Sequence, residues 1–184
     1  KMVRAHEVTL VVSIDTEEDG WGCHDPNTRL ENIRAIPELQ ALFDEYRVRP
    51  SYLVTYPVAC DGWAVETLAG IHDSGRCEIG AHLHPWNTPP VEEEICERNS
   101  MMLNLPYDLQ LRKLRTLTDR IESAFGRRPR SFRAGRWGLG PETVGALLAC
   151  GYLVDTSVSP LISWTSESGP EFVGSSREPG WLPD

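Results

Sequence analysis

The chain has 184 residues, of which 40% are hydrophobic and 24% charged, a balance typical of one soluble globular domain. Its formal net charge of −9 argues against a nucleic-acid binder, which needs a basic face toward the phosphate backbone. The apolar runs are much shorter than the roughly 18 residues of a membrane span, and the N-terminus lacks a secretory signal pattern. We therefore expect a single cytoplasmic domain over residues 1–184, with no membrane span and no nucleic-acid partner.

The cysteines stand at positions 23, 60, 77, 96 and 150, at wide spacings and without a CxxC pair. This odd and scattered set argues against a disulfide framework or a cysteine-rich zinc site. Reduced thiols in a cytoplasmic protein are the simplest interpretation.

The first half of the chain alternates between predicted strands and helices. The apolar, β-branched run Val8–Ile14 predicts a strand buried on both faces, and the acidic loop DTEEDGWG follows it. A helix comes next, with Pro37 in its first turn, and Ser51–Tyr56 predicts a second strand. Asp61 is expected to cap another helix, which ends near Gly75.

The second half continues this alternation. Cys77–Ala81 predicts a third strand, which leads straight into HLHPW and a proline-rich acidic stretch. An apolar stripe predicts a helix over Tyr107–Phe125, and Ser131–Ala134 predicts a short strand. Next come a predicted helix over Pro141–Gly151 and a predicted strand over Tyr152–Asp155. Residues 160–184 are rich in glycine and proline and have little periodicity, which predicts a loop.

Regular alternation of this kind indicates parallel strands joined by right-handed crossovers. Ligands of such folds bind outside the carboxyl ends of the strands, so the residues that directly follow each strand are the informative ones. Carboxylates, paired histidines, arginines and one tryptophan are therefore expected on one rim: Asp15, Glu17, Glu18, Asp19, His82, His84, Arg133, Arg136 and Trp137.

His82 and His84 lie on the same side of an extended backbone, because strand side chains alternate. Two histidines and one carboxylate form the ligand set of many hydrolytic zinc sites. A metal ion in such a site lowers the pKa of a bound water to about 7. A second carboxylate can serve as general base, and an arginine can orient it.

Each of these features also has a simpler interpretation. An HxH pair alone is weak evidence, an acidic loop is usually a solvated turn, and a buried arginine is more often an ion-pair partner. Trp21, Trp86 and Trp137 fit either a core or a sugar-stacking wall, and both alternatives stay open. The joint placement of all these groups at one end of one sheet favours the metal site.

The segments SIDTEEDGW, EIGAHLHPW and SFRAGRWG resemble, in order and spacing, the first motifs of NodB-type polysaccharide deacetylases, carbohydrate esterase family four. YLVTYPVA, GAHLHPWNTPP and FRAGRWG resemble the WalW/WbmS-like branch, which is linked with bacterial surface polysaccharides. The resemblance covers roughly Val8 to Phe172. It implies an α/β fold, an irregular or incomplete (β/α) barrel of the NodB type.

The resemblance also implies roles for the acidic residues and their arginine. Asp15 matches the catalytic base, and Arg133 matches the arginine that pairs with it. Thr16 stands where the family has a metal-binding aspartate, so Glu17 is the expected substitute.

The motifs EIGAHLHPW and SFRAGRWG each differ from the family pattern at positions with a known role. His82 matches the first metal-binding histidine, but Trp86 occupies the place of the second, so His84 is expected to bind instead. The family's Pro-Tyr is replaced by Gly135-Arg136, which puts the oxyanion-binding backbone amide in doubt.

We therefore expect a hydrolase that uses one divalent metal ion, zinc by preference, to deacetylate an N-acetylated sugar or polysaccharide precursor. Trp86, Arg136 and Trp137 are the expected substrate-binding residues. No histidine follows His84 to act as the family's general acid, and the predicted strands are fewer than in the family's barrel. Two alternatives remain open: an inactive carbohydrate-binding module, and an amidase for a non-sugar amide. Residues 160–184 are expected to be poorly ordered or packed over the open sheet, with self-association into a homo-oligomer.

Overall fold

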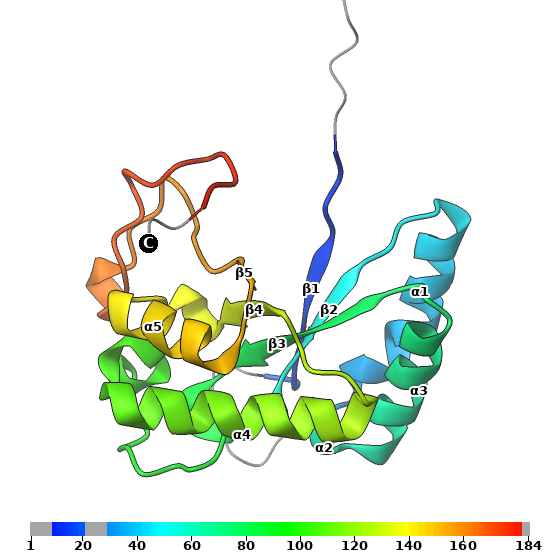
Figure 1. The fold of residues 1–184 in the computed structure, drawn as a ribbon, viewed down its shortest axis with the longest axis horizontal. Coiled ribbons are helices and arrows are strands. Elements are labelled where there is room, and N and C mark those ends of the chain that lie inside the picture. The colour runs from blue at the N-terminus through cyan, green and yellow to red at the C-terminus, as the bar shows by residue number, and fades with distance from the viewer. Residues whose placement is uncertain (1–8, 21–28, 182–184) are drawn as a thin grey trace, which may run out of the picture.

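The structure is a computed structural model that describes residues 9–20 and 29–181. Its strands are β1 (Ser13–Thr16), β2 (Ser51–Val54), β3 (Glu78–Leu83), β4 (Ser131–Ala134) and β5 (Val154–Asp155). Its α-helices are α1 (Ile36–Glu45), α2 (Tyr56–Cys60), α3 (Gly62–Asp73), α4 (Tyr107–Phe125) and α5 (Pro141–Cys150) (Figure 1).

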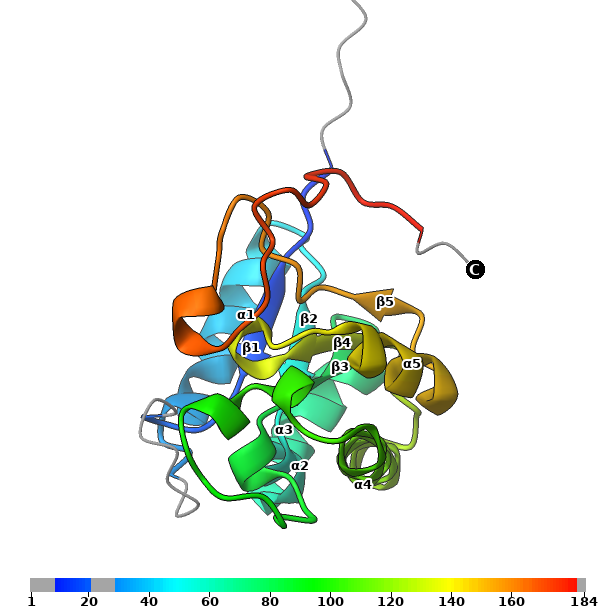
Figure 2. The same ribbon diagram turned by 90° about the vertical axis from the view of Figure 1, so that its left-hand side faces the viewer.

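The strands form one parallel sheet in the order β1-β2-β3-β4-β5. Each strand pairs with the next one in the chain, so right-handed crossovers place the connecting helices along the same side. Figure 2 shows the strands as a curved row with the helices along its outside. This is the arrangement of an open (β/α) barrel, and it confirms the α/β fold that the alternating pattern predicted.

The two faces of the sheet differ in chemistry. Toward the helices the strands contribute buried apolar side chains to the core: Tyr52, Val54, Ile79, Ala81, Leu83, Phe132 and Ala134. Alternate residues turn to the opposite face and include Ser13, Asp15, His82, Ser131 and Arg133. The helical side therefore holds the fold together, and the inner face is left for polar groups.

The predicted first strand is present, but the bounds Val8–Ile14 and the burial on both faces were wrong. β1 begins at Ser13, which pairs with Ser51 at the start of β2. Leu10 and Val11 lie before this paired region and are 73% and 79% exposed. Val8 lies outside the described residues.

The longer helices follow their sequence signals. α4 has the predicted bounds, and Gly126 ends it in the left-handed conformation with φ 69°. Asp61 caps α3 by accepting a hydrogen bond of 2.8 Å from the backbone N–H of Ala64. The predicted strand Ser51–Tyr56 was too long, because the chain turns into α2 at Tyr56 with Pro57 in its first turn.

Part of the segment 160–181 packs against the turn after β4, whereas Trp181 is 98% exposed, and the expected packing over the open sheet stays a prediction. Phe172 is buried, and the ring of Trp164 stacks on Trp137 with centroids 4.6 Å apart and planes 7° from parallel. Within the described ranges, no helix is long and apolar enough to cross a membrane. The described cysteines are free thiols, and Cys23 lies outside the described residues.

Candidate metal centre

Two histidines and one carboxylate meet at the carboxyl ends of β1 and β3. His82 lies in β3, and His84 follows it in extended conformation, so both rings project to the same side. The Oε2 atom of Glu17 lies 2.6 Å from Nε2 of His84 and 3.3 Å from Nε2 of His82. One ligand atom from each side chain falls within 4.8 Å of the others. β3 is longer than the predicted Cys77–Ala81, because its pairing with β4 extends to Leu83.

This donor set fits one divalent ion of the zinc class. Both imidazoles are buried, and both turn Nε2 toward the same carboxylate oxygen. His82 donates a hydrogen bond of 3.0 Å from Nδ1 to the backbone carbonyl of Arg133. Because a carbonyl only accepts, Nδ1 carries the proton of the neutral ring, and Nε2 then has the lone pair that a metal ligand needs.

The protonation of Glu17 and His84 favours metal binding, whereas that of His82 opposes it. Burial alone would raise the pKa of Glu17, but its contacts with His82 and His84 outweigh burial and lower this pKa to about 2. Burial lowers the pKa of His84, and this effect is larger than the opposite effect of its hydrogen bond with Glu17. Burial also acts against a charge on His82, but Glu17 and Asp15 outweigh it and raise its pKa. The site thus holds an ionised carboxylate beside the neutral imidazole of His84, and His82 must release a proton before its Nε2 can bind a cation.

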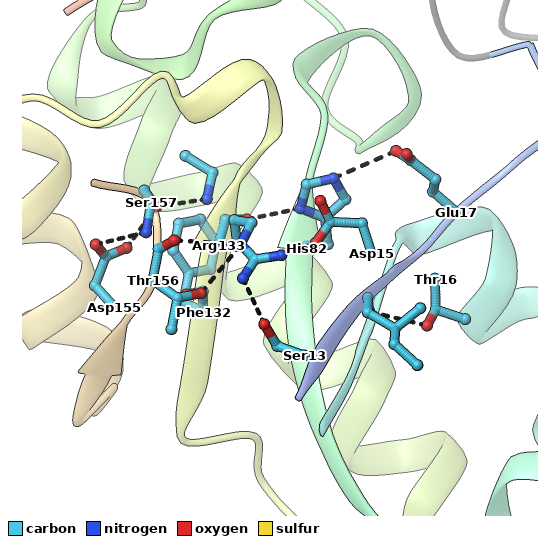
Figure 3. A network of polar contacts seen from close by, with 12 residues as sticks. Ser13, Asp15, Thr16, Glu17, His82, Phe132, Arg133, Asp155, Thr156 and Ser157 are labelled. Carbon is cyan, nitrogen blue, oxygen red and sulfur yellow. Dashed lines mark hydrogen bonds and ion pairs between the residues drawn. The ribbon is translucent and has the colours of Figure 1, made fainter. Parts of the chain in front are cut away.

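Asp15 and Arg133 form an ion pair next to these ligands (Figure 3). The Nη1 atom of Arg133 lies 2.6 Å from Oδ1 of Asp15, and its Nη2 atom donates to the hydroxyl of Ser13 at 2.6 Å. Its Nε–H faces the carbonyl and hydroxyl oxygens of Thr156, both at 3.2 Å. The guanidinium therefore joins three segments and contacts Asp15 through a single nitrogen, instead of gripping both carboxylate oxygens.

The end of β5 supports this arginine, a feature that the sequence analysis missed. The hydroxyl of Ser157 accepts a hydrogen bond from the backbone N–H of Ala134 at 2.8 Å and donates to Asp155 at 2.6 Å. Burial raises the pKa of Asp155 despite its hydrogen bonds with Ser157. The position of Thr156 and Ser157 directly after the predicted strand Tyr152–Asp155 was the available signal.

The four acidic residues at the end of β1 and just after it divide into two pairs. Asp15 and Glu17 face the site, whereas Glu18 is buried and accepts hydrogen bonds from the side chains of Thr55 and Asn87. Asp19 accepts hydrogen bonds from backbone N–H groups across its own loop. Glu18 therefore binds residues near β2 and β3, and Asp19 binds the backbone of Glu31 and Asn32.

Trp86 is a buried core residue, the first of the two alternatives that the sequence left open. It is 2% exposed, and its ring lies against His84 with centroids 4.2 Å apart and planes tilted by 32°. A buried ring offers no face to a sugar, so the expected stacking wall is not formed here. Trp21 lies outside the described residues.

Arg136 and Trp137 fasten the segment after β4 to the C-terminal residues. Arg136 pairs with Glu97 at 2.5 Å and with Glu167, so it acts as an ion-pair partner between two loops. Trp137 is half-buried under Trp164. The structure thus places both residues beside the rim, and both are engaged by other parts of the chain.

Together these features define an open α/β barrel with a candidate mononuclear metal centre and an adjacent aspartate–arginine pair. Solved structures with the same fold include a protein from Mycobacterium smegmatis assigned as a polysaccharide deacetylase. It has a TM-score of 0.60 and 18% identity, over 86% of this chain and 56% of that one. The chitin deacetylase of Colletotrichum lindemuthianum has a TM-score of 0.50 and 18% identity, over 65% and 48%. A mutant of BA3943 from Bacillus anthracis, a pseudoenzyme of carbohydrate esterase family four with restored activity, has a TM-score of 0.51 and 17% identity, over 85% and 47%.

The likeness confirms the fold of polysaccharide deacetylases for this chain, which spans about half the length of these structures. No protein-family model and no curated relative matches the sequence.

Proposed function

We propose that the protein is a metal-dependent hydrolase that removes the acetyl group from an N-acetylated sugar or polysaccharide precursor. The observation that carries this proposal is the cluster of Glu17, His82 and His84 beside the Asp15–Arg133 pair. These groups lie at the carboxyl ends of parallel strands, where folds of this class bind their ligands.

Glu17 would hold the ion through its carboxylate, and His82 and His84 through their Nε2 atoms. Three protein ligands leave a coordination position open, as hydrolytic zinc sites require. A divalent ion bound there supplies Lewis acidity, which acidifies a water molecule and polarises the substrate carbonyl.

Asp15 takes the role of general base. Its carboxylate is 29% exposed, so water and substrate can reach it, unlike the buried Glu18. It accepts the proton of the attacking water and returns it to the amine nitrogen as the carbon–nitrogen bond breaks. Arg133 orients this carboxylate, and Ser13 and Thr156 hold the guanidinium in place.

The residues around the site divide into two proposed roles. Trp137 is half-buried at the rim and remains the aromatic candidate for contact with a sugar ring, with Arg136 beside it. Trp86 acts on the site through the ring of His84.

Metal analysis coupled to acetate release tests the proposal. Purified wild-type protein should carry about one equivalent of zinc and release acetate from N-acetylglucosamine oligomers. The double variant His82→Ala/His84→Ala should lose both properties, while His72→Ala, a histidine outside the cluster, should keep them. Equal metal content in the wild type and the double variant would contradict the metal site.

A second candidate is a catalytically inactive carbohydrate-binding module on the same scaffold. The sequence has no histidine after His84 to serve as general acid, and one of the similar structures is described as a pseudoenzyme. Zinc uptake and oligosaccharide binding without acetate release would favour this candidate. Turnover of small cyclic amides, with none of acetylated sugars, would instead favour an amidase.

A further inference from the structure

The imidazole of His84 lies in a narrow slot. The ring of Trp86 covers it at a centroid distance of 4.2 Å, and Gly135 lies against its Nδ1–Cε1 edge. A Cβ atom on residue 135 would lie 2.3 Å from Nδ1 and 2.7 Å from Cε1 of His84. The slot thus has room for the ring only because residue 135 has no side chain.

The glycine is required for space and not for backbone conformation. Gly126 and Gly151 adopt positive φ angles, which favour glycine, but Gly135 is not among the glycines with positive φ. A Cβ on residue 135 would also lie 2.7 Å from the backbone carbonyl of Leu83. Leu83 is held in the β3–β4 ladder opposite Ala134, so the imidazole is the neighbour that would have to move.

His84 depends on such a slot because it lies outside the sheet. β3 ends at Leu83, so no strand pairing fixes the backbone of His84. The residue after it is restrained as well, since Lys113 donates a hydrogen bond of 2.8 Å to the carbonyl of Pro85. Within this frame, Nε2 of His84 points at Glu17 at 2.6 Å.

We propose that Gly135 is a positioning residue that holds the His84 imidazole in the orientation needed for metal binding. The missing side chain lets the ring settle against the β4 turn, so that its Nε2 converges with that of His82 on Glu17. The metal part of this inference rests on the proposed function, whereas the placement of the ring does not.

Gly135→Ala tests the slot, and Gly70→Ala in α3 is the matched control, because a Cβ there would meet nothing within 4 Å. In metal-free protein, the imidazole nitrogen signals of His84 should shift in Gly135→Ala and stay in place in the control. Zinc affinity, measured by competition with a chromophoric chelator, should fall roughly 10–100-fold in Gly135→Ala only. Unchanged His84 signals and unchanged affinity would overturn the proposal.

The midpoint of thermal unfolding distinguishes a clash with His84 from a general folding defect. Overpacking by Gly135→Ala should lower the midpoint by roughly 2–12 °C in the wild-type background. The loss should be clearly smaller in a His84→Ala background, where only the Leu83 carbonyl remains in the way. Equal losses in both backgrounds would refute the link to His84. If the wild type takes up no zinc while the His84 signals still shift, the slot stands and the proposed function fails.

Discussion

Replacing Arg133 by lysine separates its charge from its geometry. The guanidinium contacts Asp15, Ser13 and Thr156 with three different nitrogens. A lysine keeps the positive charge but places it at one point on a flexible stem. It can therefore satisfy one of these partners and must release the others.

The size of the effect follows from these contacts. A hydrogen bond to a charged group contributes about 1.5–3 kcal/mol, and each 1.36 kcal/mol of lost transition-state stabilisation is tenfold in rate. If Asp15 loses one such restraint, or moves by about 1 Å, kcat should fall roughly 10–100-fold. KM should change less, because Arg133 acts on the proposed base and not on the substrate.

Steady-state acetate release by zinc-loaded protein measures both parameters. Arg112→Lys is the matched control, because Arg112 pairs with Glu92 on the surface of α4, and kcat should be unchanged in that variant. If Arg133→Lys lowers the unfolding temperature but leaves kcat unchanged, the arginine only closes a structural ion pair and the reasoning is refuted.

Three further predictions concern the ligands and their support. Asp15→Asn should keep zinc but lose about 10²–10⁴-fold in kcat, whereas Glu17→Gln should lose zinc; the opposite pattern in metal analysis would exchange the two roles. Zinc affinity should fall as the pH is lowered, and the fall should begin above pH 6.5, the ordinary pKa of histidine. Burial opposes a charge on His82, but Glu17 and Asp15 raise its pKa above that value, and a protonated imidazole cannot bind the ion. A pH-independent affinity between about pH 6 and about pH 8 would exclude this competition by protons. Lys113→Ala should lower the free energy of unfolding in denaturant by about 3–5 kcal/mol, because it leaves the buried carboxylate of Glu93 unpaired. The variant should also bind zinc more weakly, because Lys113 holds the carbonyl of Pro85 next to His84. A decrease in unfolding free energy below about 1 kcal/mol would count against a paired charge at Lys113.

Local sequence signals determined most of the scaffold. The apolar stripe over Tyr107–Phe125 and the glycine after it defined α4, because helix period and helix end are properties of neighbouring residues. The alternation of His82 and His84 placed both rings on one side, and parallel topology placed them at the same end of the sheet as Glu17.

The tertiary structure decided how these groups are held. The sequence could not show that Leu10 and Val11 lie before the paired part of β1, since strand ends depend on where the neighbouring strand begins. Trp86 was ambiguous for the same reason: whether a ring stacks on a histidine or faces solvent depends on residues distant in the chain. Gly135 lies 51 residues beyond His84 in the sequence, and only packing brings the two into contact. Periodicity and caps are local properties, whereas burial and the geometry of a ligand set depend on contacts between distant segments.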